Sequence, residues 1–154
     1  MTEYLSTIEK RSYEKEDIIP IYFKTYDQSS YKDVEEYKYQ VFSRSDFLSI
    51  LNRGPEMGVN NAIFQDFRLH LQSIEDKVQS YKHLPIDPEN KWPKQSRVGF
   101  YLRFQKELGA GLWKEVSNKS GGFLGFWWGG IQGSEICKPY LLLEQEKLCF
   151  KITS

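Results

Sequence analysis

The sequence has few of the residues from which disulfide frameworks, metal centres or membrane spans are built. Its two cysteines, Cys137 and Cys149, match no metal-ligand spacing, and we expect reduced thiols, with a disulfide as the alternative. No apolar run approaches the roughly 18 residues that cross a membrane. The first residues also lack the basic and apolar regions of a signal peptide. We therefore expect a cytoplasmic protein without a membrane partner.

The chain also has no excess of charge of either sign. Its 21 basic side chains balance 21 acidic ones, so the total charge gives no reason to expect a nucleic-acid partner. Aromatic residues make up 16% of the 154 residues, although 27% are charged, which indicates a globular fold with an aromatic core. A chain of this length suits one domain, residues 1–154.

Two C-terminal runs of aromatic and aliphatic residues predict buried strands. They cover residues 121–130 and 139–152, and glycine, proline or charged residues bound them. Residues 118–122 and 144–147 are typical of hairpin turns. Together with residues 112–116, these runs predict an antiparallel four-stranded meander.

The N-terminal third predicts strands alternating with helices. Residues 18–25 predict a strand in which Pro20 favours an early or edge position. A helix should follow to about residue 39, with Ser30 and Asp33 as a capping box, and then a short strand at 40–43. Ser45 should cap the next helix, which ends at Gly54. This order implies a right-handed crossover and a small parallel sheet. Before it, residues 1–17 predict one short amphipathic helix.

Two further helices connect this part to the meander. The longer begins after Asn60 or Asn61 and runs to about Tyr81, with apolar residues three and four apart. A proline-rich loop leads to the second, at residues 96–108. We expect an α+β fold: a small parallel βαβα edge in residues 1–53, then two helices packed on the meander in residues 60–154. The face that should meet the sheet contains Phe67, Leu71, Ile74 and Val78.

The C-terminal runs resemble a known family. Gly-Gly-Phe-Leu-Gly-Phe-Trp-Trp at 121–128 and the closing strand at 143–152 resemble the C-terminal portion of a bacterial family in the PD-(D/E)xK nuclease superfamily. The resemblance covers nearly the whole chain, and it extends to Ile21–Thr25, Asp27–Ser29, Ser43–Leu48, Phe64–Phe67 and Gly99–Tyr101.

The resemblance implies a metal-dependent hydrolase whose cutting core is missing from this chain. The carboxylates that hold Mg²⁺ and the Glu-x-Lys strand would precede residue 1. Lys24 does not replace them, because Tyr22 stands where the glutamate is needed. We therefore expect no catalytic residue, metal site or cofactor here, and no cleavage of DNA or RNA by the chain alone. Whether the protein has an enzymatic activity stays open.

Two functions are compatible with this pattern. In the first, the chain is a non-catalytic part that braces a nuclease fold, with a missing N-terminal nuclease half as its partner, and positions DNA. In the second, it is a freestanding protein-binding module.

Asp66 with His70, and separately Asp27, could be functional, but we favour a structural role for each. Asp66 and His70 lie four apart on the long predicted helix, a spacing that suits two metal ligands. No third ligand accompanies them, and an aspartate near a helix start is stabilised by the helix dipole. Asp27 follows a predicted strand, where α/β sheets place functional groups, but it equally begins a turn.

One segment is locally basic. Residues 91–119 contain seven basic and two acidic side chains. If this surface contacts phosphates, lysine, arginine and turn amides would supply the donors, whereas the alternative is a solvated surface. The predicted nucleic-acid contacts are Lys94, Arg97, Arg103, Lys106, Asn118 and Lys119.

Trp127 and Trp128 are the last residues that we consider as a candidate site. Trp127 and Trp128 should point to opposite faces of their strand. One should therefore lie in the core, and the other should be covered by a helix or exposed.

Overall fold

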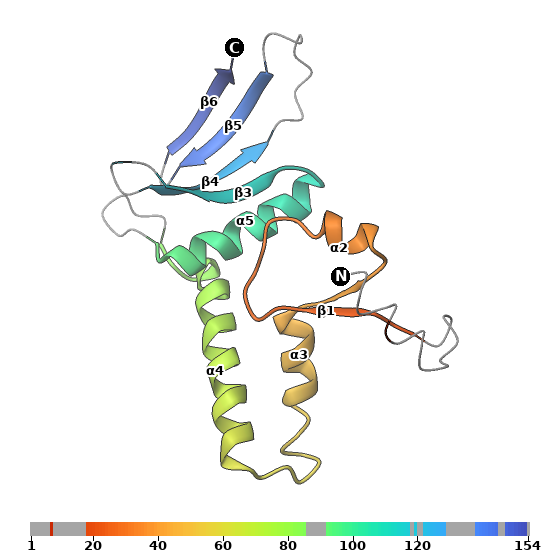
Figure 1. Cartoon of the computed structure of the whole chain (residues 1–154). Helices are drawn as coiled ribbons and strands as arrows, with labels where there is room; N and C mark the ends of the chain where they lie inside the picture. The colour runs from red at the N-terminus through yellow and green to blue at the C-terminus, as the bar shows by residue number, and fades with distance from the viewer. Residues whose placement is uncertain are drawn as a thin grey trace.

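The fold combines a short parallel strand pair, a helical middle and an antiparallel C-terminal sheet (Figure 1). The computed structural model describes residue 7 and residues 18–85, 92–117, 119, 122–128, 138–144 and 147–153. This confirms the expected mixture of helices and strands. The predicted N-terminal helix, Asn118 and most of the two predicted turns lie outside the described residues. No helix in the described part is long and apolar enough to cross a membrane.

The N-terminal sheet contains two parallel strands. β1 (Ile21–Phe23) pairs with β2 (Gln40–Phe42), and α2 (Lys32–Glu36) connects them. The parallel pairing is as expected, but β1 is shorter than the predicted strand, since β2 offers three partners and the carbonyl of Thr25 accepts a hydrogen bond from Arg44 instead.

The caps of the first two helices differ from the prediction. Tyr31, not Ser30, precedes α2, because the Ser30 hydroxyl accepts the N–H of Lys32 in a local turn. Ser43, not Ser45, caps α3 (Arg44–Leu51). The Ser43 Oγ accepts from the Asp46 N–H at 3.2 Å, while an Asp46 carboxylate oxygen accepts from the Ser43 N–H at 2.9 Å, which is a reciprocal capping box.

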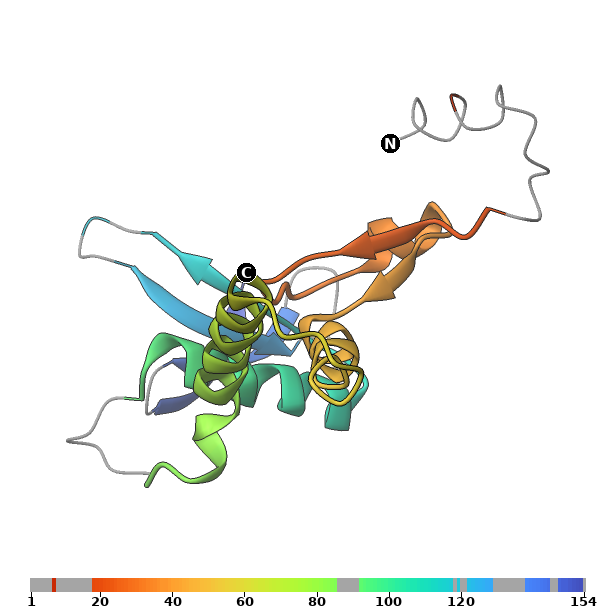
Figure 2. The same ribbon diagram turned by 90° about the horizontal axis from the view of Figure 1, so that it is seen from below.

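The packing of the long helix corrects one expectation. α4 (Ala62–Gln79) begins after Asn61, as predicted, and a short 3₁₀ helix, η2 (Ser80–Lys82), replaces its last predicted turn. Leu71 packs with Leu48 and Leu51 of α3, and Phe67 contacts Phe47. The apolar face of α4 therefore packs on α3 around Leu71 and meets α5 (Lys94–Leu108) at Val78, rather than packing on the C-terminal sheet. Figures 1 and 2 show the two helices side by side, with α4 extending away from that sheet.

The second core lies between α5 (Lys94–Leu108) and the C-terminal sheet. Val98 and Tyr101 of α5 pack against Leu124 and Phe126 of the sheet. α5 begins two residues earlier than predicted, and Gly109 ends it with a left-handed φ of 61°.

That sheet has the predicted meander order, β3-β4-β5-β6, and each neighbouring pair is antiparallel. Its strands are β3 (Leu112–Val116), β4 (Phe123–Trp128), β5 (Lys138–Glu144) and β6 (Lys147–Thr153).

The tryptophan pair divides between the two faces of β4. Trp128 packs against the core below α5. Trp127 lies on the other face, where its ring is 6.0 Å from Phe123 and 5.3 Å from the ammonium of Lys114. Both side chains are half-buried.

Small residues allow α5 to cross the end of α4. A Cβ atom at Gly99 would clash with the Val78 carbonyl oxygen, so only glycine permits this approach. The hydroxyls of Ser80 and Ser96 are 2.6 Å apart, and Ser96 is completely buried. The two cores are therefore joined by close packing at this crossing.

Replacing Leu71 with alanine tests the packing of α4 on α3. Leu71 is 1% exposed, so Leu71→Ala should lower the free energy of unfolding by roughly 2–5 kcal/mol. Leu69 lies two residues away and is 56% exposed, so Leu69→Ala is the matched control, with a change of about 0.5 kcal/mol or less. Urea denaturation measures both; equal changes would contradict this packing.

The corrected helix cap gives a second test. Ser43→Ala should lower the free energy of unfolding by about 1 kcal/mol, whereas Ser45→Ala should change it by about 0.5 kcal/mol or less. A larger effect at Ser45 in urea denaturation at pH 7 would refute the assignment of Ser43 as the cap.

The same cap makes the stability depend on pH. Hydrogen bonds from the Ser43 hydroxyl and N–H lower the pKa of Asp46 from its ordinary 3.8. Because the pKa in the folded state is depressed, the stabilisation is complete above pH 3.8 and is lost as the pH falls below it.

Candidate functional site: a buried arginine between two pockets

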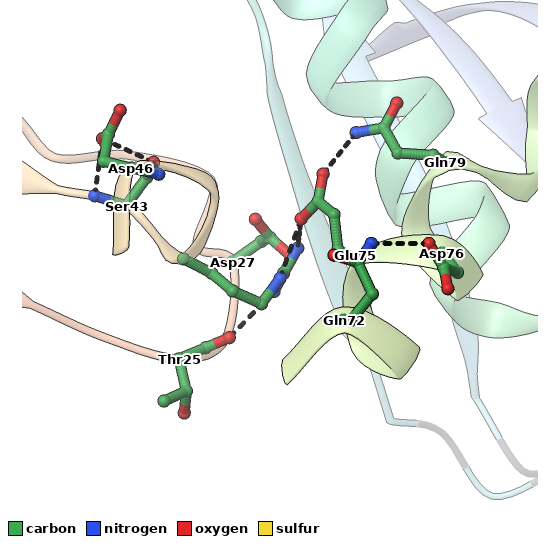
Figure 3. A network of polar contacts seen from close by, with 9 residues as sticks. Thr25, Asp27, Ser43, Asp46, Gln72, Glu75, Asp76 and Gln79 are labelled. Carbon is green, nitrogen blue, oxygen red and sulfur yellow. Dashed lines mark hydrogen bonds and ion pairs between the residues drawn. The ribbon is translucent and has the colours of Figure 1, made fainter. Parts of the chain in front are cut away.

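The main polar site is built around Arg44, whose side chain is 3% exposed. Its Nη1 donates to the Thr25 carbonyl at 2.8 Å and lies 2.9 Å from an Asp27 carboxylate oxygen. Its Nε and Nη2 both contact Glu75 Oε2, at 2.9 and 2.8 Å (Figure 3). One guanidinium therefore joins the loop after β1, the start of α3 and the middle of α4.

The electrostatics of this site keep the arginine charged. Burial alone would lower the pKa of Arg44, but the charge of Asp27 and the hydrogen bonds that Arg44 donates to Asp27 and Glu75 outweigh it and raise the pKa. Nearby, burial and the charge of Asp27 raise the pKa of Tyr31. Glu75 is held from its other side, because Gln79 donates to its Oε1 at 2.8 Å. The buried cation is thus fully paired.

Two pockets share Asp27, Arg44 and Val78 in their walls. The first, of about 500 Å³, extends toward the sheet, and we call it the sheet-side pocket. Besides the shared residues, its lining includes Tyr26, His70, Ile74, Lys77, Lys94, Gln95, Val98, Trp113 and Glu115.

The second pocket, which we call the basic pocket, has a volume of about 330 Å³. Lys82 of η2 and Arg103 and Lys106 of α5 line it, together with Arg44. Asp27 and Glu75 are its anionic side chains. Four cationic groups therefore face two anionic ones.

The site is arranged for binding rather than for proton transfer. The Arg44 guanidinium has no lone pair to accept a proton, and both carboxylates are engaged by it. Among the described residues, no group of three histidine, cysteine, aspartate or glutamate side chains could hold a metal ion. What the described groups offer is a fixed charge pattern beside two concavities.

The structure separates the predicted basic residues. Lys94 forms an exposed ion pair with Glu115 at 2.5 Å and lines the sheet-side pocket. Arg97 is half-buried, and its Nε has no hydrogen-bond partner among the described residues. Lys119 is exposed, whereas Asn118 lies outside the described residues.

Arg103 and Lys106 lie elsewhere on α5. Nine residues separate Lys94 from Arg103, about two and a half helical turns, so the two side chains leave opposite sides of the helix. Arg103 pairs with the exposed Glu107, and Lys106 lines the basic pocket. Nucleic-acid binding by the whole segment stays a prediction.

The remaining candidates have the following places. Asp66 and His70 are exposed on α4, and His70 lines the sheet-side pocket. The Lys24 ammonium donates to the Gln28 side chain at 3.2 Å. Asp27 lies in the loop after β1 as an ion-pair partner of Arg44, a role that the sequence did not indicate.

Sequence reasoning also missed Arg44, Glu75 and Lys82 as site residues. Arg44 stands between two serines at a helix start, and Glu75 looks like an ordinary acidic residue of an amphipathic helix. The one available signal was the spacing of Glu75 between Leu71 and Val78, on the side of α4 that is buried.

Comparisons with protein-family models, curated proteins and solved structures find no match to this chain. Membership of the nuclease superfamily therefore stays a prediction from the sequence resemblance.

Removing the arginine tests its role. Arg44→Met leaves Asp27 and Glu75 without their cation, so the free energy of unfolding should fall by about 3 kcal/mol. The control, Arg103→Met, breaks an ion pair whose side chains are 59% and 56% exposed, and it should cost about 0.5 kcal/mol or less. If Arg44→Met does not fold, Glu75→Gln retains hydrogen-bond acceptors and should still destabilise more than Arg103→Met. Equal urea midpoints would contradict this.

Proposed function

We propose that the chain is a non-catalytic interaction part of a larger α/β assembly, in which β1 pairs with a parallel strand of a partner. In the form that the sequence resemblance favours, that partner is the core of a PD-(D/E)xK nuclease-like protein. The observation that supports the proposal is the two-stranded parallel sheet, which stops at β1 in the described part of the chain.

A parallel pair of this size is incomplete by itself. Parallel sheets normally have several strands, and helices cover both of their faces. Two-stranded sheets are marginally stable in water, and a free strand edge invites pairing with another chain. A sheet that ends after two parallel strands in the described part of the chain would therefore be stabilised by a further strand.

The main-chain geometry identifies the side on which that strand would pair. Pro20 accepts a hydrogen bond from the Gln40 N–H at 2.8 Å, so Pro20 directs its main-chain groups toward β2. Because alternate residues of a strand direct their N–H and C=O groups to opposite sides, Ile21 and Phe23 direct theirs away from β2. The donor that proline lacks is therefore not needed at the outer edge.

The side chains of the same residues are apolar and exposed. Ile19, Ile21 and Phe23 are 64%, 57% and 40% exposed and lie on one face of the strand. The Phe23 ring lies 4.8 Å from Phe47, which in turn contacts the half-exposed Phe67, so the apolar face continues onto the helices. A partner strand with an apolar face would bury this surface, whereas a charged strand would not.

A photo-crosslinking amino acid at position 21 tests the proposal in the cells that make the protein. Position 57 is the control, since Met57 is 79% exposed and belongs to the connection between α3 and α4 rather than to the parallel sheet. We expect one partner to be crosslinked from position 21 only. The crosslinked peptide of that partner should have apolar residues at alternate positions, as a strand does. Ile21→Lys should lower affinity for that partner at least about tenfold, because an unpaired charge would be buried, and Met57→Lys should not.

The identity of the crosslinked partner separates the two functions. A partner with paired carboxylates and a Glu-x-Lys strand supports the nuclease-like assembly, and any other sheet supports a freestanding protein-binding module. Equal crosslinking from positions 21 and 57, no crosslink, or crosslinks only between copies of this chain would refute the proposed partner strand.

A further inference from the structure

The basic pocket, on the α5 side of Arg44, gathers cations from separate elements. Lys82 comes from η2, and Arg103 and Lys106 lie about one helical turn apart on α5. Its volume of about 330 Å³ is at the lower end of the range for small-molecule sites, roughly 300–1,000 Å³. The pocket is therefore large enough for a compact ligand.

These cations are available to a ligand. Among the described residues, Lys82 and Lys106 have no carboxylate partner. The Lys82 ammonium lies 6.0 Å from the centre of the Tyr81 ring, a weak interaction. The ion pair of Arg103 with Glu107 is exposed, and such pairs contribute little stability. All three groups can reorient toward an anion without breaking a buried contact.

Nearby groups limit what else the pocket can attract. The carboxylates of Asp27 and Glu75 are held by Arg44, which reduces their repulsion of an anion. The start of α3 is already satisfied by the Ser43 and Asp46 capping box. Side-chain cations would therefore hold the anion, with no help from a helix end.

The arrangement favours a compact ligand over a nucleic-acid strand. A strand is held by a row of phosphate contacts along a surface. Lys94 and Arg103 leave opposite sides of α5, and Lys94 is paired with Glu115, so these cations do not form one row. The three cations instead converge on a single concavity.

We propose that the basic pocket binds the phosphate group of a compact phosphorylated ligand, such as a nucleoside monophosphate, through Lys82, Arg103 and Lys106. Lysine and arginine are the usual partners of phosphate oxygens, and charge-assisted hydrogen bonds to them are strong. This inference is independent of the β1 edge, since it uses other residues and a different part of the molecule.

Isothermal titration and amide chemical-shift mapping with the full chain test the proposal. The probes are inorganic phosphate, pyrophosphate, adenosine 5′-monophosphate and adenosine. We expect the phosphorylated probes to bind and adenosine not to bind, with shifts at η2 and the C-terminal half of α5. Replacing Lys82, Arg103 and Lys106 together with glutamine should weaken binding at least about tenfold.

A matched variant controls for total charge. Lys32→Gln, Arg53→Gln and Lys119→Gln also remove three exposed cations, none of which lines the basic pocket, so binding should change less than about twofold. Absent binding at millimolar probe concentrations, or equal losses in the two variants, would overturn the proposal. A titration with an oligonucleotide tests whether the ligand is a polymer. Oligonucleotide binding that needs Lys94 and Arg97 as much as Lys82 and Lys106 would show a nucleic-acid surface instead.

Discussion

The pairing of Arg44 with Asp27 and Glu75 holds together three parts of the chain that are far apart in sequence. A buried guanidinium is costly unless it is paired, and here each of its three nitrogens contacts a carboxylate, with the Thr25 carbonyl as a further acceptor. The loop after β1, the start of α3 and the middle of α4 are consequently fixed to one another. The apolar packing of Leu71 on α3 reinforces the same arrangement.

This constraint also creates the two pockets. Since Arg44 holds α3 and the loop beside α4, while α5 crosses α4 at Gly99, a gap remains on each side of the ion network. The crossing at Gly99 places the C-terminal half of α5 opposite the start of α3. Cations that are far apart in sequence, Lys82 and Lys106, thereby line one concavity.

The two halves of the fold differ in how complete they are. The C-terminal sheet has a core of its own beneath α5, formed around Tyr101 and Phe126. In the described part of the chain, the parallel pair leaves Ile19, Ile21 and Phe23 exposed, with no core of its own over that face. Figures 1 and 2 show the pair set apart from the C-terminal sheet. This difference is why the proposed partner contact lies at β1.

The sequence by itself determined the elements whose signals are local. Alternating apolar runs with glycine and charged boundaries were sufficient for the meander, and Gly109 for the end of α5, because these features depend on neighbouring residues. Asn61 as the cap of α4 followed in the same way. Only the tertiary structure decided which element covers α4, since an apolar stripe shows that a partner exists without showing which one. The role of Arg44 also depended on it, because the carboxylates that pair with the arginine are 17 and 31 residues away.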